Sequence, residues 1–385
     1  MAKVRMGMVG GGEGAFIGAI HRMAAALDGE IELVCGAFSS TADRSLRSGQ
    51  ALHLPAERCY SNYEAMFREE ATLPADQRMQ FVVIVTPNHL HLPVALMAIE
   101  AGFHVLCDKP ATLNLAEAIT LREALASSDC LYGLTHTYAG YPLVKEARCR
   151  VASGQLGTVR RVIVQYPQGW LANAADGEDD KQPIWRLDPA RAGLSSCMGD
   201  IGVHAAHLLE YITQLHISAL CADLGSVVAG RTLDDDGAIL LRLENGARGV
   251  LLASQVALGE ENALSISVYG DAASLTWSQQ EPNTLIIQYA DRPSEILRAG
   301  ASYLDSHTLQ FSRTPTGHPE GYIEAFANLY IAFAEQVRAA KESRAAQSWA
   351  LDCPGIEEAI RGMAFIEVAV AASGSDIKWH DVSVV

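Results

Sequence analysis

The feature that most constrains the fold is a glycine-rich loop near the start of the chain, between an expected strand and an expected helix. The apolar run Val4–Val9 predicts a buried strand, and Ile17–Leu27 has the apolar spacing of a helix. The loop between them, Gly10–Gly18, opens with Gly10 and Gly12 but is longer than the usual dinucleotide-binding motif. Glycines allow close backbone approach and a helix N-terminus attracts phosphate, so this order predicts a dinucleotide site, with a merely flexible turn as the alternative.

Strands and helices alternate through the first third of the chain. Alternation of this kind, with strands that are apolar throughout, is typical of a parallel sheet covered on both faces. We therefore expect an α/β fold in which residues 1–135 form a doubly wound Rossmann domain. The further strands expected are Ile31–Phe38, Phe81–Val85 and His104–Cys107, and the helices are His91–Ala101 and Asn114–Ala126.

The pattern changes near residues 135–138, where short strands separated by turn signals begin. Such strands predict an antiparallel sheet. We expect residues 136–385 to form an α+β domain with a large, mainly antiparallel open sheet that binds substrate and mediates oligomerisation. Its expected strands are Val159–Tyr166, Ala238–Leu243, Gly249–Gln255, Leu264–Tyr269, Ser274–Trp277, Leu285–Tyr289 and Ile377–Val384, with helices at Gly202–Leu215 and Tyr322–Lys341.

Composition excludes several partners. Lys and Arg total 29 and Asp and Glu total 45, a net charge of −16, which disfavours nucleic acid and anionic membranes. No apolar run reaches the roughly 18–20 residues of a membrane span and no secretory signal is visible, so we expect a cytoplasmic protein. Eight widely spaced cysteines predict free thiols. Asp234–Asp236 predicts a solvated turn and no metal site, because the Gly and distal Glu of a calcium loop are missing.

The end of the second expected strand bears on the choice of cofactor. An NAD site commonly has Asp or Glu there to bind the ribose hydroxyls. This chain has Ser39, Ser40 and Arg44 instead, which suit a 2′-phosphate. Alternatively, Ser39 caps the next helix and Arg44 is solvated. Both NAD and NADP stay open, with the balance toward NADP.

Three further segments carry a family resemblance. They are Thr86–His91, Ala101–Pro110, and Trp185–Arg186 followed by Gly199–His204. In this order and spacing they resemble the Gfo/Idh/MocA family (glucose–fructose oxidoreductase and inositol dehydrogenase) over essentially the whole chain. The loop Gly14–Gly18 and the segment His318–Tyr322 look like members of the levoglucosan dehydrogenase type.

The resemblance implies a set of site residues. Asp108 stands where the family motif has Glu, which puts its cofactor contact in question, and Lys109–Pro110 is expected to be a cis peptide bond. The implied catalytic residues are Lys109, Asp200 and His204. The expected cofactor-binding residues come from the glycine loop, the end of the second strand and the family motifs. They are Gly10, Gly12, Phe16, Ile17, Ser39, Ser40, Arg44, Thr86, Pro87, Asn88, His91, Asp108, Lys109, Trp185 and Arg186. The substrate-binding candidates are Lys109, Tyr138, Gln165, Trp170, Arg186, Asp200 and His204.

Chemistry supports these roles independently of the family. A neutral histidine has a suitable pKa to take the proton of a secondary alcohol, and on a helix Asp200 and His204 would share one face. Lys109 ends a parallel strand at its carboxyl edge, where it would hold the reacting oxygen. Taken singly, His204 suits a structural histidine, Asp200 a helix cap and Lys109 a surface lysine. Whether His207, His307 and His318 line the pocket stays open.

We therefore expect an NAD(P)-dependent oxidoreductase that acts on a ring hydroxyl or ketone of a sugar, anhydrosugar or cyclitol. A cofactor-retaining epimerase or glycoside-cleaving enzyme of the same fold, or a non-catalytic NAD(P)-binding sensor, are the alternatives. A homodimer or homotetramer is expected, because a sheet with helices on one face leaves its other face to be covered. The sequence names neither the substrate nor the direction of the reaction.

Overall fold

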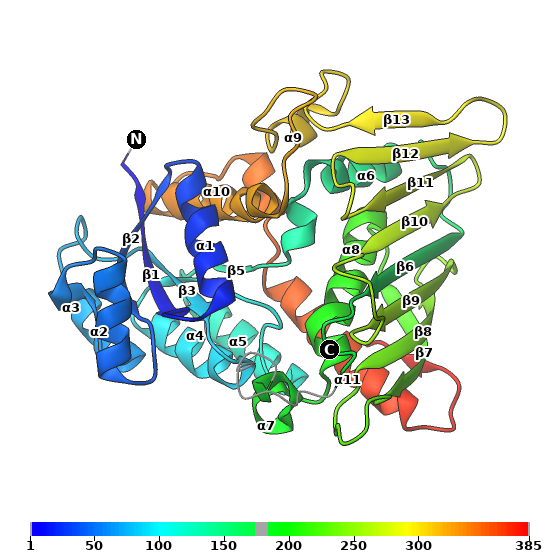
Figure 1. The fold of residues 1–385 in the computed structure, drawn as a ribbon. Coiled ribbons are helices and arrows are strands. Elements are labelled where there is room, and N and C mark those ends of the chain that lie inside the picture. Colours follow the sequence, from blue (N-terminus) through cyan, green and yellow to red (C-terminus); the bar gives the residue numbers. More distant parts are fainter. Residues whose placement is uncertain (1, 174–183, 384–385) are drawn as a thin grey trace. The chain divides into compact units, whose positions relative to one another are not determined.

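The structure, a computed structural model, describes residues 2–173 and 184–383. The chain divides into two compact units (Figure 1). The first comprises Met1–Thr135 and Phe326–Ile360, and the second His136–Ala325 and Arg361–Val385. The sequence division assigned the whole of residues 136–385 to the second domain, and Phe326–Ile360 corrects it. This segment packs with the first unit because its apolar side chains contact the parallel sheet: Phe333 meets Phe81 edge to face, with ring centroids 5.5 Å apart.

The first unit is built on a five-stranded parallel sheet in the order β2-β1-β3-β4-β5. Strand β3 is fully buried, as a strand covered on both faces must be. The strands are β1 (Val4–Gly10), β2 (Ile31–Ala37), β3 (Phe81–Val85), β4 (His104–Cys107) and β5 (Tyr132–Leu134). The helices are α1 (Phe16–Leu27), α2 (Ala42–Ala51), α3 (Tyr63–Thr72), α4 (His91–Glu100) and α5 (Leu115–Ala126), with short 3₁₀ turns η1 (Ala56–Arg58) and η2 (Asn88–Leu90).

Local sequence signals explain where these helices begin. The Asn114 side chain accepts from the Glu117 backbone N–H at 2.9 Å, and the Glu117 carboxylate accepts from the Leu113 N–H at 3.0 Å. This reciprocal arrangement satisfies two backbone donors at the start of α5. Asn62 caps α3 in the same way. The sequence analysis did not predict α2 or α3.

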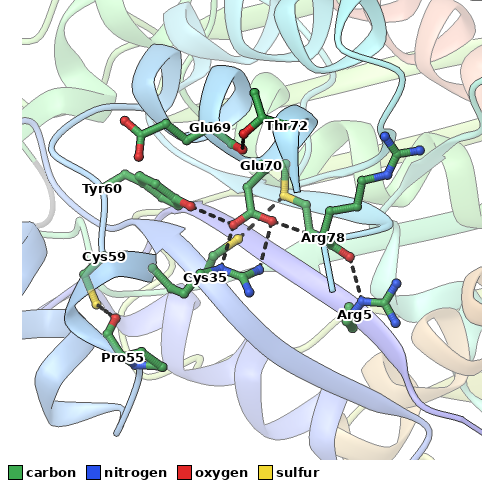
Figure 2. A network of polar contacts seen from close by, with 11 residues as sticks. Arg5, Cys35, Pro55, Cys59, Tyr60, Glu69, Glu70, Thr72 and Arg78 are labelled. Carbon is green, nitrogen blue, oxygen red and sulfur yellow. Dashed lines mark hydrogen bonds and ion pairs between the residues drawn. The ribbon is translucent and has the colours of Figure 1, made fainter. Parts of the chain in front are cut away.

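A buried acidic side chain fixes the segments around β2 (Figure 2). Glu70 of α3 is fully buried and accepts from Arg58 Nε at 2.7 Å and Arg58 Nη2 at 2.8 Å. It also accepts from the Tyr60 hydroxyl at 2.8 Å and from the Met79 N–H at 2.9 Å. The four donors come from both sides of α3 in the chain, so one carboxylate ties η1 and the approach to β3 to the same helix.

The second unit contains a nine-stranded sheet in the order β13-β12-β11-β10-β6-β9-β8-β7-β14. All neighbours are antiparallel except β6 and β9, so the expected mainly antiparallel sheet is confirmed. Its strands are β6 (Arg161–Pro167), β7 (Ile217–Gly225), β8 (Asp236–Leu243), β9 (Arg248–Ser254), β10 (Ser265–Tyr269), β11 (Ala273–Ser278), β12 (Thr284–Tyr289), β13 (Glu295–Arg298) and β14 (His380–Asp381). The expected terminal strand Ile377–Val384 is thus reduced to β14, and its last residue lies outside the described residues.

Helices α6 and α8 cover one face of this sheet (Figure 1). Along β6, Val162, Val164 and Tyr166 are buried on that side, whereas Arg161 and Gln165 point to the exposed side. The shorter segments are η3 (Thr137–Gly140), η4 (Ile184–Leu187) and the π-helical η5 (Met198–Gly202). The helices are α6 (Pro142–Ala152), α7 (Pro189–Ala192), α8 (Val203–Thr213) and α9 (Ser306–Leu309). The last helical elements along the chain are α10 (Tyr322–Lys341), the 3₁₀ turn η6 (Ser348–Asp352) and α11 (Ile356–Ser373).

Candidate active site

In the glycine loop of the first unit, Gly10, Gly11, Gly12 and Gly18 leave no room for a side chain, whereas a Cβ on Gly14 would meet nothing within 4 Å. Gly10 and Gly11 have positive φ values of 82° and 68°. A Cβ on Gly10 would lie 2.7 Å from the Val85 carbonyl oxygen, and one on Gly12 would lie 2.6 Å from that of Phe38. Gly18, which comes late in the sequence motif, packs directly on Gly11, where a Cβ would meet backbone at 2.3 Å. The glycines therefore bring the loop, β2 and β3 within backbone contact at the carboxyl edge of the sheet.

The helix that follows is suited to an anion. Helix α1 has no acidic residue in its first turn and no side-chain N-cap. Its first N–H groups, at Phe16 and Ile17, are therefore not blocked by a side-chain acceptor of the cap. The Phe16 side chain is 60% exposed, which is high for an apolar residue and is consistent with a ligand covering it.

The polar residues after β2 lie at the same edge. Arg44 Nη2 donates to the Glu13 carbonyl oxygen of the glycine loop at 3.3 Å. The Ser39 hydroxyl accepts a long hydrogen bond of 3.4 Å from the Thr41 N–H, and Ser40 is exposed. Helix α2 has no side-chain N-cap, so Ser39 does not cap it as the alternative required. Two hydroxyls and a guanidinium thus stand where the second strand ends.

The turn after β3 holds a buried polar atom without a protein partner. The Thr86 hydroxyl is buried and makes no hydrogen bond to the described residues. An orphaned buried hydroxyl costs free energy unless a ligand satisfies it. Thr86 follows β3, the neighbour of β1, and the strand order reverses between these two strands. Open α/β sheets bind ligands at such a point. Together with the glycine cradle, this atom fits a dinucleotide. Pro87 precedes η2, and Asn88 begins it and is buried.

His91 contacts the backbone of two turns at this edge of the sheet. Its Nδ1 lies 2.7 Å from the Pro110 carbonyl oxygen and its Nε2 lies 2.9 Å from the Thr86 carbonyl oxygen. Burial lowers the pKa of His91, which favours a neutral ring that donates to one carbonyl at a time. His91 therefore joins the turns after β3 and β4 through the two backbone carbonyls that its ring nitrogens face.

The turn after β4 presents the candidate lysine. Asp108 Oδ1 accepts from the Lys109 N–H at 2.9 Å and from the Thr135 hydroxyl at 2.9 Å. The Lys109–Pro110 peptide bond is cis, as expected. The shorter Asp108 side chain, which replaces the family's Glu, is thus used to hold the backbone of Lys109 and the end of β5.

In the second unit, Asp200 and His204 lie on consecutive turns, because η5 runs directly into α8. Asp200 Oδ2 accepts from Gln255 Nε2 at 2.9 Å, and its Oδ1 lies 3.6 Å from Arg186 Nε. The Arg186 guanidinium in turn lies over the Trp185 ring, 4.7 Å from its centroid. One amide and one guanidinium therefore orient the carboxylate of Asp200.

An aromatic and amide network lies beside His204. The Tyr138 ring packs edge to face on the His204 ring at 4.9 Å, and the Tyr138 hydroxyl is hydrogen-bonded to that of Tyr166. Tyr166 donates to Asn262 Oδ1 at 2.6 Å, and Gln168 Nε2 donates to the same oxygen at 2.7 Å. Burial raises the pKa of both phenols, so both stay protonated near neutral pH.

Two expectations about the second unit are corrected. Gln165 points to the exposed face of β6, opposite Tyr166, because side chains alternate along a strand. Asp234–Asp236 is no solvated turn. Asp235 is fully buried and pairs with Arg231 at 2.7 Å, and Asp234 accepts from Ser195 Oγ and the Ser196 and Met198 N–H groups, each at 2.9 Å. These partners compensate the cost of burying the carboxylates.

The remaining candidates divide between the network and the surface. Trp170 is 45% exposed and donates to Gln168 Oε1 at 2.9 Å, which connects it to the network. His207 stacks on His136, as considered below. His307 packs against Phe311, and His318 is exposed beside the Pro315 carbonyl oxygen. Among the described residues no group of His, Cys, Asp and Glu could hold a metal ion.

Sequence reasoning missed Tyr166, Gln168, Gln255 and Asn262, which join the network through tertiary contacts. It also missed His136, although this residue directly follows β5, the last strand of the parallel sheet. The carboxyl ends of parallel strands lie at one edge, so a histidine at that point was a usable signal.

Comparison with known proteins identifies the family. Residues 4–136 match the model of an oxidoreductase family with an NAD-binding Rossmann fold, and residues 144–276 match the GFO/IDH/MocA C-terminal domain. The uncharacterized oxidoreductase YfiI of Bacillus subtilis is 32% identical over 379 residues, which is 98% of this chain and 96% of that protein. The chain belongs to the Gfo/Idh/MocA family. It is an oxidoreductase with an NAD-binding Rossmann domain, as its motifs predicted.

The chain is also similar to proteins whose ligand or activity is named. An inositol dehydrogenase homologue from Azotobacter vinelandii, solved with NAD⁺, has a TM-score of 0.93 and 35% identity, covering 98% of this chain and 97% of that one. An inositol dehydrogenase homologue from the same organism, solved with NADH and myo-inositol, has a TM-score of 0.91 and 34% identity, covering 98% of this chain and 97% of that one. Levoglucosan dehydrogenase of Pseudarthrobacter phenanthrenivorans is 25% identical over 315 residues, covering 75% of this chain and 77% of that protein. No helix within the described residues is long and apolar enough to cross a membrane.

Proposed function

We propose that this member of the family is a dehydrogenase that moves hydride between NAD(P) and a ring hydroxyl or ketone of a sugar, anhydrosugar or cyclitol. The observation that carries the proposal is the arrangement in the second unit, where Asp200, His204 and a network of phenols and amides lie together. A ring with several hydroxyls needs such a set of donors and acceptors, because each hydroxyl taken from water must find a new partner. A relative that binds myo-inositol and another named levoglucosan dehydrogenase support the same class.

The proposal assigns the first unit to the cofactor. The glycine loop and the start of α1 would hold the pyrophosphate, and Thr86 and Asn88 would hold the ribose near the nicotinamide. When bound, the nicotinamide accepts the hydride that leaves the substrate carbon. The chain's own groups handle the proton. His204 accepts the hydroxyl proton, Lys109 stabilises the developing negative charge on the oxygen, and Asp200 orients a neighbouring hydroxyl.

The preference within NAD(P) is proposed to favour NADP. Ser39, Ser40 and Arg44 stand at the end of β2, and Asp43, the acid closest in sequence, is paired with Arg47. A guanidinium and two hydroxyls recognise a phosphate, whereas a strand-end carboxylate would repel it.

We also propose that the exposed face of the nine-stranded sheet binds a second copy of the chain. Apolar pairs lie toward both ends of one row across this face, with Leu240 opposite Val250 and Ile286 opposite Ile296. The polar pair Ser267 and Thr276 lies between them. Leu240 is 46% exposed and Ile296 55% exposed. Self-association would remove these apolar side chains from water. A monomeric mass at micromolar concentration in light scattering would contradict the proposal.

A panel of sugars, anhydrosugars and cyclitols with NAD and NADP tests the function by nicotinamide absorbance. We expect turnover of at least one ring alcohol, and His204→Ala should lower its kcat by about 10²–10⁴-fold, the usual contribution of a general base. His318→Ala, at an exposed site, is the matched control. Tight cofactor retention without net nicotinamide turnover would favour the epimerase or glycoside-cleaving alternative. Cofactor binding with no conversion of any substrate would favour a sensor.

A further inference from the structure

The ring of His136 lies against the proposed general base. His136 precedes η3 and is only 1% exposed. Its Nδ1 lies 3.5 Å from the Nδ1 of His204, and the two rings meet edge to face with their centroids 5.4 Å apart. This distance is at the long end of hydrogen bonding, as is common before a substrate tightens a catalytic site.

Two nitrogens that face each other restrict the tautomers of both rings. A hydrogen bond between two Nδ1 atoms needs one donor and one acceptor. If His204 acts as a base through Nε2, that atom must carry a lone pair, so the ring proton lies on Nδ1. His204 Nδ1–H then donates to His136 Nδ1, and the proton of neutral His136 lies on its own Nε2.

The neighbouring rings hold this pair in place. The His207 ring stacks on the His136 ring, with 4.0 Å between the ring centroids and 6° between the ring planes. Tyr211 continues the stack at 5.8 Å from His207. On its own side, His204 is packed against the edge of Tyr138. Turning either imidazole out of its plane would disrupt an aromatic contact, so these contacts fix the plane in which each ring lies.

We propose that His136 is a positioning residue that holds His204 as its Nδ1–H tautomer and leaves Nε2 to accept the substrate proton. The inference rests on the proposed function, since it assigns the tautomer that a base requires. When the alcohol is oxidised, the hydroxyl proton moves to His204 Nε2 while the O–H electron pair stays on oxygen. The resulting imidazolium keeps its Nδ1–H bond to a neutral partner, where other enzymes use a carboxylate.

The groups around the pair bear on its pH dependence. Tyr138 of η3 and Tyr166 of β6 are protonated phenols, and His207 and Tyr211 lie on α8. Asp200 of η5 is the acid on the preceding turn and is held by Gln255 and Arg186. Lys145 of α6 donates to the Tyr211 hydroxyl at 3.3 Å, and Arg148 lies over the Tyr211 ring.

Three substitutions of His136 separate shape from hydrogen bonding. His136→Phe keeps a stackable ring but has no acceptor. His136→Asn places an amide oxygen near the former Nδ1, and His136→Asp places a charged acceptor there. Loss of an outer partner that orients a ligating or catalytic histidine commonly costs about 10–100-fold, so we expect His136→Phe to lower kcat by that factor with little change in KM. His136→Asn should recover most of it. His216→Asn, beyond the far end of α8, is the control and should match the native enzyme.

The pH profile and the tautomer provide readouts that a purely structural role would not move. A carboxylate stabilises an imidazolium, so in His136→Asp the rising limb of kcat against pH should shift upward by about one unit or more. Nitrogen-15 NMR of the native protein should show His204 protonated on Nδ1, and His136→Phe should lose this preference. Circular dichroism and thermal melts identify a variant that fails to fold. If His136→Phe fails to fold, the kcat of His136→Asn and the tautomer of His204 in the native protein test the inference.

The outcomes distinguish the inference from the function on which it rests. Absence of turnover by the native protein on every ring alcohol would refute the proposed function, whereas the tautomer would still be measured. A native His204 protonated on Nε2 would overturn the inference. A folded His136→Phe variant with kcat within about threefold of native, or with an unchanged His204 tautomer, would overturn it as well.

Discussion

Replacing Glu70 by Gln should destabilise the first unit strongly, although the side chain keeps its size. Glu70 is fully buried, and its two oxygens accept from Arg58, Tyr60 and the Met79 N–H (Figure 2). The amide can still accept through one oxygen, but its NH₂ group faces one Arg58 N–H together with either the Tyr60 hydroxyl or the Met79 N–H. The guanidinium then loses its counter-charge in a site where only 18% of its side chain is exposed.

The magnitude follows from that burial. Removing one partner of a buried ion pair costs about 3–5 kcal/mol, and the partial exposure of Arg58 places this case at the lower end, about 3 kcal/mol. Because Gln fills the same volume, no cavity contributes. For a unit of this size, at about 2–4 °C per kcal/mol, the change corresponds to a fall in Tm of about 6–12 °C.

Urea unfolding followed by circular dichroism, with hydrogen exchange of β2 and α3, measures the effect. The adjacent Glu69→Gln is the matched control. Glu69 is 54% exposed and lies 3.5 Å from the exposed Arg68, so its loss should cost less than about 1 kcal/mol. If Glu70→Gln changed the free energy of unfolding by no more than the control, the buried carboxylate would not organise this region as inferred.

Three further predictions concern cofactor choice, the reacting oxygen and acid stability. Ser39→Asp should reduce the preference for NADP over NAD by at least about tenfold in the ratio of kcat/KM values, since it places a carboxylate beside a phosphate; a native enzyme that already prefers NAD would contradict the phosphate role. Lys109→Ala should impair kcat and KM together, and its effect on kcat should not multiply with that of His204→Ala if both act on one proton transfer. Burial lowers the pKa of His21 from 6.5 to about 4, so the unfolded chain binds more protons and stability should fall by about 3 kcal/mol as pH drops from 6.5 toward 4; in His21→Gln the unfolding free energy should depend less on pH over this range.

The general architecture was accessible from the sequence because the relevant signals are local. An apolar run that ends in glycines before a helical pattern determines the strand, the loop and the helix together, and these residues form β1, the loop and α1. The later short strands are also predicted by local signals, namely alternating apolar residues and the turn residues between strands. The ordered motifs around Lys109, Asp200 and His204 identified the family for the same reason, since each is a short contiguous segment.

The composition of the second unit's polar network depended on tertiary structure. Tyr166 and Asn262 are 96 positions apart in the chain, and Asp200 and Gln255 are 55 apart. No local pattern states which strand ends and loops will meet. Asp234 shows the same limitation, because three acids in a row suggest water until the Ser195 hydroxyl and the Ser196 and Met198 N–H groups are brought to Asp234 from 36–39 positions away.

What the sequence alone determined was therefore the kind of element at each place and the residue types available for chemistry. Tertiary structure decided which of them meet: Gln165 is turned away by strand alternation, while His136 is brought against His204 across 68 positions of chain. The physical reason is that backbone periodicity acts over a few residues, whereas the burial that pairs polar groups acts between segments that only folding brings together.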